Sequence, residues 1–297
     1  MQNILLLGKN GQVGQALQDV LSTKVNLHAF DSKDADLTDE RKLRQLIQDI
    51  KPAVIVNAAA YTAVDRAKSE EALAFKVNAR GPQTLGEEAT TIGAAVIHFS
   101  SDYVFDGTKD GAYVETDKTN PLSVYAASKL EGEKLLMKAC DRSLILRTSW
   151  VVSHHGGNFL KTMLKLAHER EVLRVVADQH GVPTSAHLLA EMSLMLIEKL
   201  SQDLEDFPFG IYHVAPKGET TWFDYAKFVI GEAMKRGDTF KLNLDNMNAI
   251  KTEEYPLPAK RPQNSRLNTH HFEETFGVTL PSWESGILAI MDELYKG

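Results

Sequence analysis

Tyr125 and Lys129 are the residues whose types and spacing point most directly to chemistry. They lie four positions apart in a stretch with helical periodicity, so their side chains project from one helix face, one turn apart. A tyrosine titrates near ~10, and a neighbouring ammonium favours the phenolate, which brings the phenol closer to what a proton donor or acceptor needs at neutral pH. Such pairs also occur by chance on solvated helices. The catalytic interpretation of this pair therefore depends on other polar groups that lie close to it.

Two serines supply such groups. Ser100 and Ser101 follow the apolar run 94–99, which is typical of a buried strand. A hydroxyl at the carboxyl end of a strand can orient a substrate carbonyl. We therefore predict that Tyr125, Lys129 and Ser101 form a catalytic set that transfers a proton to or from a carbonyl oxygen.

A glycine-rich turn indicates a cofactor site. Gly8, Gly11 and Gly14 lie in the segment GKNGQVG, between an apolar run at 4–7 and a stretch of helical period. Missing side chains let backbone amides at a helix N-terminus approach a pyrophosphate. The segment is not a P-loop, because no Gly-Lys-Ser or Gly-Lys-Thr follows. A glycine triplet alone also suits a tight turn, so the surrounding residues decide the interpretation.

Asp31 supports a dinucleotide. It comes 20 positions after Gly11, at the end of the second predicted strand, where Rossmann proteins place a carboxylate on the adenosine ribose. A carboxylate there disfavours a 2'-phosphate, whereas Lys33 would tolerate one, so the choice between NAD and NADP stays open. The small residues 57–60 after the third strand let a cofactor lie close to the sheet.

The first half of the chain alternates short apolar runs with helical periods, which predicts a parallel sheet with crossover helices. The fold class is therefore α/β, a Rossmann-type doubly wound sheet. The predicted strands are 4–7, 27–30, 54–56, 94–99 and 144–146, and the predicted helices are 13–21, 43–50 and 124–138.

The second half is less regular. We predict a dinucleotide-binding domain over 1–150 and a smaller, sequence-interleaved substrate lobe over 151–297, with a return strand near 210–215. The expected elements of this part are helices at 158–170 and 187–199 and a strand at 173–176, while residues 221–236 and the proline-rich segment 256–262 are expected to cover the substrate.

The bulk properties exclude several classes of protein. The 297 residues are 43% hydrophobic, enough for a substantial core, and carry a net charge of −7 without long single-sign runs, which argues against a nucleic-acid binder. The single cysteine, Cys140, fits a reducing compartment. No apolar stretch reads as a signal peptide or a membrane span. We expect a cytoplasmic protein.

The combined motifs resemble the extended short-chain dehydrogenase/reductase superfamily and, within it, the dTDP-4-dehydrorhamnose reductases. The resemblance runs from Ile4 to about Trp283, and its most specific segments are SDYVFDG, DQHGVPT and RPQNS. The matching segments are GKNGQVG, VNAAAYTAVDRA, SSDYVFDG, NPLSVYAASKLEGE, RTSWV, GGNF, KTMLKLAHER, VADQHGVPT and RPQNSRL.

The resemblance implies reduction of the C4 ketone of a dTDP-6-deoxy-4-ketosugar to dTDP-L-rhamnose, with hydride from NADPH or NADH. Tyr125 would give the proton, Lys129 would lower the pKa of Tyr125 and hold the nicotinamide ribose, and Ser101 would bond the carbonyl oxygen. On the sugar side it implies Asp102 and Trp150, with Arg261 at the substrate diphosphate. The implied cofactor contacts are Gly8, Gly11, Gln12, Val13, Gly14, Asp31, Asp36, Leu37, Ala60, Tyr61 and Thr62, besides Tyr125 and Lys129.

Two departures from the family pattern bear on these expectations. Val152 and Ser153 stand where the family usually has tyrosine and glycine, so the sugar pocket differs locally. Some relatives dimerise through a metal held by acidic residues, one of them at the position of Ala16. We therefore expect no metal, and a homodimer, if formed, without a metal bridge.

Two alternatives remain. A sugar-nucleotide epimerase of the same superfamily uses the same tyrosine and lysine but returns the hydride to its substrate. A 4,6-dehydratase needs an additional acid where Tyr103 stands, and tyrosine is a poor acid for that elimination. The second alternative is a non-catalytic regulatory subunit, as one relative serves for a methionine adenosyltransferase.

Overall fold

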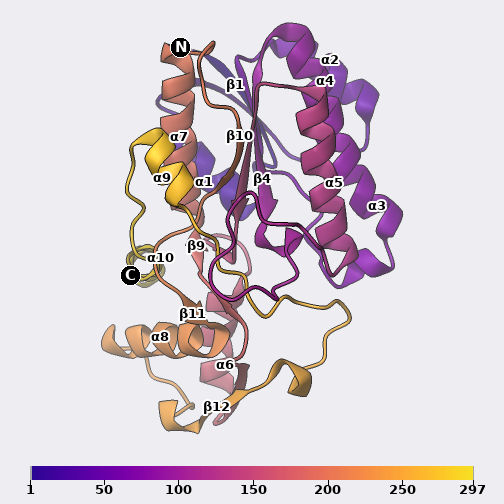
Figure 1. The fold of residues 1–297 in the computed structure, drawn as a ribbon. Helices are drawn as coiled ribbons and strands as arrows, with labels where there is room; N and C mark the ends of the chain where they lie inside the picture. Colours follow the sequence, from indigo (N-terminus) through magenta and orange to yellow (C-terminus); the bar gives the residue numbers. More distant parts are fainter. Residues whose placement is uncertain (1, 297) are drawn as a thin grey trace.

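The computed structural model describes residues 2–296, whose central element is a parallel sheet of six strands (Figure 1). The strand order is β10-β5-β4-β3-β1-β2, and every pairing is parallel. This order and the flanking helices confirm the predicted Rossmann-type α/β fold. The strands are β1 (Asn3–Leu7), β2 (Asn26–Phe30), β3 (Val54–Asn57), β4 (Ala95–Ser101), β5 (Ser143–Thr148) and β10 (Gly210–His213).

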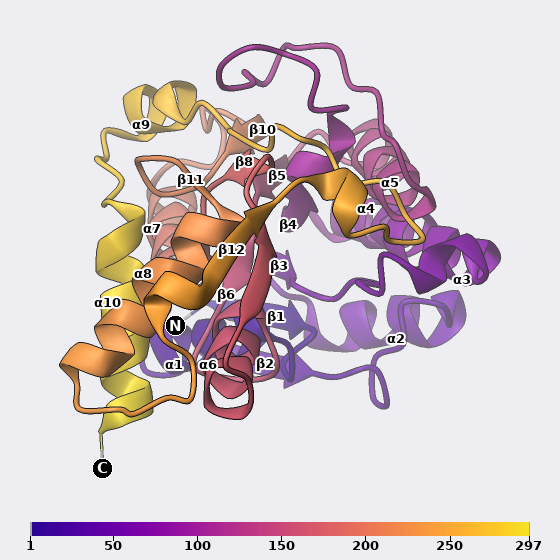
Figure 2. The same ribbon diagram turned by 90° about the horizontal axis from the view of Figure 1, so that it is seen from below.

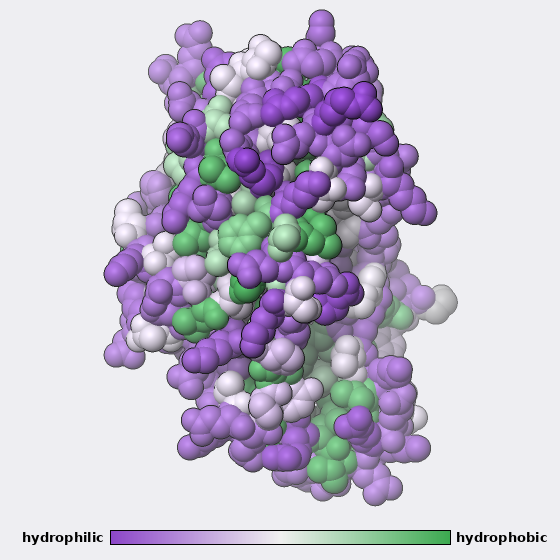
Figure 3. All heavy atoms as spheres, turned by 90° about the vertical axis from the view of Figure 1, so that its right-hand side faces the viewer, coloured by the Kyte–Doolittle hydropathy of each residue, from purple (hydrophilic) through white to green (hydrophobic). Residues whose placement is uncertain are grey.

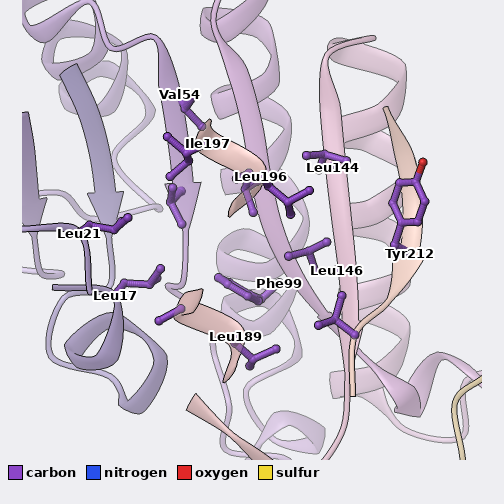
Figure 4. Close-up of a cluster of buried hydrophobic side chains, with 14 of the residues drawn as sticks. Leu17, Leu21, Val54, Phe99, Leu144, Leu146, Leu189, Leu196, Ile197 and Tyr212 are labelled. Carbon is purple, nitrogen blue, oxygen red and sulfur yellow. The ribbon is translucent and has the colours of Figure 1, made fainter. Parts of the chain in front are cut away.

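Helices cover both faces of the sheet and make it a three-layer structure. On one face, Leu17 and Leu21 of α1 (Gln12–Leu21) and Leu189 and Leu196 of α7 (Ala186–Gln202) pack on the strands (Figure 4). The other face is covered by α2 (Glu40–Ile50), α4 (Gly81–Ile92) and α5 (Val124–Ala139). The sheet is therefore buried on both sides, which explains its nearly continuous apolar strands.

Most of the remaining elements form a smaller body beyond the carboxyl ends of the strands (Figure 2). Its main elements are α6 (Phe159–Glu169), β7 (Leu173–Val176), α8 (Trp222–Lys235), β12 (Met247–Ile250) and α10 (Trp283–Tyr295). Its shorter elements are β6 (Val151–Val152), β8 (His180–Gly181), β9 (Thr184–Ser185) and β11 (Thr220–Thr221). Two short helices pack on the larger body instead: α3 (Glu71–Phe75) beside α5 and α9 (His270–Phe276) beside β10. The domain division at residue 150 stays a prediction, although α7 and β10 come from the second part of the chain and pack on the first.

Helix α4 was not among the predicted elements. Pro82 lies in its first turn, and Gly93 ends it in the left-handed conformation with φ 75°. Proline at a helix start and glycine just past its end are the expected boundary signals, so the sequence did carry this helix. No helix between residues 2 and 296 combines the length and apolarity needed to cross a bilayer.

Candidate active site

The glycine-rich turn leaves no room for side chains. Gly8 has φ 87°, and a Cβ on it would lie 2.6 Å from the amide nitrogen of Ala59. A Cβ on Gly14 would lie 2.0 Å from the Gly8 carbonyl oxygen. Helix α1 then begins at Gln12 without a capping side chain at Gly11 and without an acidic residue in its first turn. These features fit a diphosphate bound by backbone amides.

The first turn of α1 is also tied to the second half of the chain. Gln12 donates to the Val151 carbonyl oxygen at 3.3 Å and accepts from Asn158 at 2.9 Å. Val13 is partly buried against the sheet. The predicted cofactor turn therefore lies beside the segment that follows β5.

Asp31 lies at the end of β2, beside the glycine turn. Its carboxylate accepts the Lys33 amide at 2.9 Å and the Asn10 side chain at 2.8 Å. The Lys33 backbone hydrogen bond is the main cause that lowers the Asp31 pKa. The carboxylate is thus charged and held in place at the position expected for the adenosine ribose.

The other predicted cofactor residues after β2 differ in exposure. Asp36 is exposed and accepts the Thr38 amide at 2.8 Å, whereas Leu37 is buried against Gly81 of α4. Leu37 therefore shapes the packing beneath this loop.

Tyr61 is connected to the predicted catalytic helix by Asn78, a residue the sequence analysis missed. Asn78 accepts the Tyr61 amide at 2.8 Å and donates to the Tyr61 carbonyl at 3.0 Å and to Ser128 of α5 at 3.0 Å. It lies in a π-helical turn, η2 (Lys76–Arg80). Gly132 lets α5 approach this turn, because a Cβ there would lie 1.9 Å from the Asn78 carbonyl oxygen. No local pattern marks such a turn in the sequence.

The neighbours of Tyr61 in this loop, Ala60 and Thr62, follow β3 at the same sheet edge. Ala60 is partly buried and Thr62 is exposed. The Tyr61 hydroxyl donates to Glu70 at 2.6 Å. The loop is therefore anchored at both its backbone and its aromatic ring.

Ser101 and Asp102 end β4 as a buried polar pair. The Ser101 hydroxyl donates to Asp102 Oδ1 at 2.8 Å and accepts the Tyr103 amide at 3.1 Å. The second carboxylate oxygen of Asp102 is buried and meets no hydrogen-bond partner within residues 2–296. Burial raises the pKa of Asp102 to about 6, against the opposing effect of the Ser265 and Ser101 hydroxyls.

Tyr125 begins α5 beside this pair. Removal from water raises the pKa of Tyr125 to about 12, the Asp102 charge raises it further, and the Ser101 hydroxyl opposes both. Its ring meets the edge of the Tyr103 ring at 6.2 Å between centroids. Tyr125 thus keeps its proton at neutral pH, as a proton donor must.

Lys129 is buried against β4, where it contacts Phe99 and His98. Its Nζ donates to the Phe99 carbonyl oxygen at 2.7 Å and lies 3.3 Å from His98 Nε2. Burial lowers the pKa of Lys129 to about 8, which Glu133 opposes. The net shift of the Tyr125 pKa is upward rather than downward, because burial and the Asp102 charge raise it. The effect of Lys129 on Tyr125 stays a prediction.

Helix α5 is held on the sheet by a buried ion pair. Arg147 of β5 donates to both carboxylate oxygens of Glu133, at 3.0 and 2.7 Å, and both side chains are at most 3% exposed. The Ser100 hydroxyl donates to the same carboxylate at 2.5 Å. Glu133 lies two turns after Tyr125, so this pair fixes the helix that carries the predicted proton donor.

A pocket of about 1090 Å³ opens beside Tyr103, between that residue and the smaller body. Figure 3 shows the right-hand side of Figure 1, where apolar side chains gather in a band across the middle and again in the lower part. Four exposed apolar side chains line the pocket: Leu122, Val172, Tyr255 and Leu257.

Trp150 lies behind one wall of this pocket. Its backbone has φ 44°, a conformation that non-glycine residues rarely adopt, and its ring stacks on Trp222 at 3.7 Å between centroids. Trp222 lines the pocket and donates to Gln179, which also lines it, at 3.2 Å. Sequence reasoning missed Trp222 and Gln179, which lie far from Trp150 along the chain.

Arg261 also lines the pocket, and Asp65 holds it there. Its guanidinium donates to Asp65 at 2.8 Å and to the Ala259 carbonyl oxygen at 2.9 Å. The Ala259 amide donates to the same carboxylate at 3.1 Å. The loop around Arg261 is thereby tied to the loop that follows β3, close to the predicted cofactor residues.

Comparisons with known proteins agree with this geometry. The model of the RmlD substrate binding domain family matches residues 1–296. A dTDP-4-dehydrorhamnose reductase of Escherichia coli K12 is 47% identical over 99% of this chain and 98% of its own length. The chain belongs to the dTDP-4-dehydrorhamnose reductase family.

Solved structures of the dTDP-4-dehydrorhamnose reductase family have the same fold. A dTDP-4-dehydrorhamnose reductase from Clostridium acetobutylicum superposes with a TM-score of 0.91 at 35% identity, covering 98% of this chain and 99% of that one. The Bacillus anthracis enzyme, solved in complex with NADP, gives 0.89 at 34% identity with the same coverage. These matches favour neither the epimerase nor the regulatory subunit.

In this member of the dTDP-4-dehydrorhamnose reductase family, Asp102→Asn is expected to increase stability at pH 8. Between the unfolded pKa of 3.8 and the folded pKa of about 6, the folded state binds more protons, so stability falls as pH rises through this window. Removing the charge restores on the order of 2 kcal/mol above pH 6. Urea unfolding at pH 4 and pH 8 measures the difference.

The control is Asp106→Asn. The Asn120 side chain is the main cause that lowers the Asp106 pKa, so this carboxylate stabilises the fold when charged, and its loss destabilises at pH 8. An Asp102→Asn protein no more stable than the wild type at pH 8 would contradict the assigned burial penalty.

Proposed function

We propose that the chain reduces the C4 ketone of dTDP-4-dehydro-6-deoxy-L-mannose to dTDP-L-rhamnose with NADPH. The observation that carries the proposal is the meeting of Ser101, Asp102 and Tyr125, whose ring contacts the pocket residue Tyr103, in a chain 47% identical to a dTDP-4-dehydrorhamnose reductase. The product is an activated sugar for polysaccharide biosynthesis.

Tyr125 is the proton donor in this proposal. Its raised pKa keeps the phenol protonated until negative charge develops on the C4 oxygen. The Ser101 hydroxyl bonds the same oxygen and orients the carbonyl. Lys129 holds the nicotinamide ribose, and its positive charge favours the phenolate that forms as Tyr125 gives up its proton.

The substrate lies in the pocket beside Tyr103. In this proposal Asp102 accepts a hydrogen bond from a sugar hydroxyl, and Trp150, held by its stack on Trp222, contacts the sugar. Arg261 meets the diphosphate, since a guanidinium pairs well with phosphate oxygens, and Asp65 orients it.

NADPH, when bound, supplies the hydride. The residues that would hold it follow the sheet edge, and the missing side chains of Gly8 and Gly14 let the backbone of the turn pack closely, so that its amides can bind the diphosphate. The proposed contacts are Gly8, Gly11, Gln12, Val13, Gly14, Asp31, Asp36, Leu37, Ala60, Tyr61, Thr62, Tyr125 and Lys129.

We also infer the setting of the reaction. The dinucleotide-binding domain spans 1–150 with β10, and the substrate lobe spans most of 151–297. The unpaired Cys140 is consistent with the cytoplasm. The dTDP-sugar is the partner, and a homodimer would form without a bridging metal.

The test is the decay of NADPH absorbance with purified protein and dTDP-4-dehydro-6-deoxy-L-mannose. Rapid oxidation that requires the sugar nucleotide, with dTDP-L-rhamnose as the product, supports the reductase. Tight cofactor binding without oxidation would contradict it.

Asp31 sets a second prediction, on cofactor preference. Asp31→Asn is expected to lower KM for NADPH relative to NADH by roughly three- to tenfold, because a carboxylate repels a 2'-phosphate and accepts a 2'-hydroxyl. Steady-state kinetics with each cofactor measure the ratio. Asp49→Asn removes an equal charge from the far end of α2 and should leave the ratio unchanged. An unchanged ratio in Asp31→Asn would mean that Asp31 lies away from the ribose.

A further inference from the structure

Three buried polar side chains form a row that ends at Lys129. They come from β3, β4 and α5: Asn57, His98 and Lys129, each at most 2% exposed. The Asn57 side-chain nitrogen lies 3.0 Å from His98 Nδ1, and His98 Nε2 lies 3.3 Å from Lys129 Nζ. His98 therefore contacts Lys129 within the buried interior, and nothing in the proposed reaction yet uses it.

The hydrogen bonds of Asn57 decide which ring nitrogen of His98 carries the proton. The Ala59 amide donates to Asn57 Oδ1 at 3.1 Å, so the NH₂ end of Asn57 faces His98 Nδ1. An NH₂ group only donates, so Nδ1 accepts with its lone pair. Burial lowers the pKa of His98 well below its usual value, and the ring is neutral. The single ring proton is then on Nε2, facing Lys129.

This arrangement acts differently on the two forms of Lys129. A neutral amine accepts the Nε2–H of His98, whereas an ammonium has no lone pair and meets that N–H as a repulsive neighbour. The Phe99 carbonyl oxygen, 2.7 Å away, accepts a hydrogen bond from either form. Glu133, one turn along α5, favours the ammonium, but Arg147 of β5 neutralises much of its charge. Tyr125, one turn earlier, is neutral.

We propose that His98 is a positioning residue that sets the charge on Lys129 by presenting its Nε2 proton to Nζ. The inference rests on the proposed function, because the reaction uses the ammonium form of Lys129. The low Lys129 pKa, about 8, then places the loss of this charge within the working range of pH. kcat/KM for NADPH, which reports the free enzyme, falls as pH rises through that value.

The test is the pH profile of kcat/KM in His98→Phe. A phenyl ring keeps the volume and burial of the side chain but removes the N–H. The pH at which kcat/KM falls should therefore rise by roughly half a pH unit to one unit. His213→Phe is the matched control: His213 is also fully buried, but it bonds the Tyr113 and Asn268 carbonyls and does not touch Lys129. In His213→Phe, kcat/KM should fall at the same pH as in the wild type. If kcat/KM falls at the same or a lower pH in His98→Phe than in the wild type, the proposal is overturned.

A measurement on the wild type stands independently of whether His98→Phe folds. Nitrogen-15 spectra of labelled histidine distinguish a ring protonated at Nε2 from one protonated at Nδ1. We expect His98 to carry its proton on Nε2 at pH 7, and a proton on Nδ1 would overturn the proposal. If the wild type lacks reductase activity, the proposed function fails while the tautomer is still measured. If it is active and kcat/KM falls at the same pH in His98→Phe as in the wild type, only this inference fails.

Discussion

Replacing Tyr125 with phenylalanine is expected to lower kcat by at least about a hundredfold, which is the usual contribution of general acid catalysis. The variant loses the only group in the proposed mechanism that gives a proton to the C4 oxygen, while the ring and its edge contact with Tyr103 remain. NADPH affinity should change little. The decay of NADPH absorbance under saturating sugar nucleotide measures kcat.

Tyr103→Phe is the matched control for this prediction. Tyr103 is the neighbouring tyrosine, its ring contacts that of Tyr125, it lines the pocket, and burial raises its pKa as well. It has no proton-transfer role in the mechanism, so kcat should fall by less than about tenfold, below the usual range for general acid catalysis. Equal losses in both variants would show that a hydroxyl in the pocket, rather than Tyr125 itself, matters for the reaction.

Arg147→Met is expected to destabilise the fold by about 3–5 kcal/mol, because it leaves the Glu133 carboxylate buried without its partner. The Ser100 hydroxyl remains as a donor to that carboxylate but cannot replace two charged hydrogen bonds. Urea unfolding at neutral pH measures the loss.

Two further variants test the cause of that loss. Glu133→Gln combined with Arg147→Met removes both charges and should restore most of the stability, since the penalty comes from the unpaired charge. Arg66→Met breaks an exposed pair, with Arg66 71% exposed and 2.6 Å from Glu70, and should cost less than about 1 kcal/mol. A double variant as unstable as Arg147→Met would assign the loss to packing instead.

The sequence was sufficient for the parts of the molecule that depend on local patterns. The strands at Ile4 to Leu7 and Val54 to Val56 carry continuous apolar runs, as expected for a sheet covered on both faces. The i, i+4 spacing placed Tyr125 and Lys129 on one helix, which the structure confirms as α5.

The electrostatics of the site could not be predicted in the same way. The pKa of Tyr125 depends on its removal from water and on the charge of Asp102, which are set by how α5 packs at the end of β4. The contacts of Lys129 with His98 and Phe99 depend on the register of the helix against the strand. Neither quantity follows from spacing along the chain.

The contacts between segments far apart in the sequence could not be predicted either. Asp65 and Arg261 are 196 positions apart, and their pairing depends on how the loop around Arg261 lies against the loop that follows β3. Asn78 lies in a π-helical turn that no periodicity marks. Such residues become recognisable only when three-dimensional proximity is known.

The placement of α7 and β10 limits how parts of this enzyme can be exchanged with those of its relatives. Helix α7 lies beside α1, and β10 pairs with β5, although both come from the second half of the chain (Figure 1). A chimaera with one crossover at residue 150 would therefore join a foreign helix and a foreign edge strand to the native sheet. Grafting a new sugar specificity needs crossovers on either side of 186–213, so that this stretch is inherited together with residues 1–150.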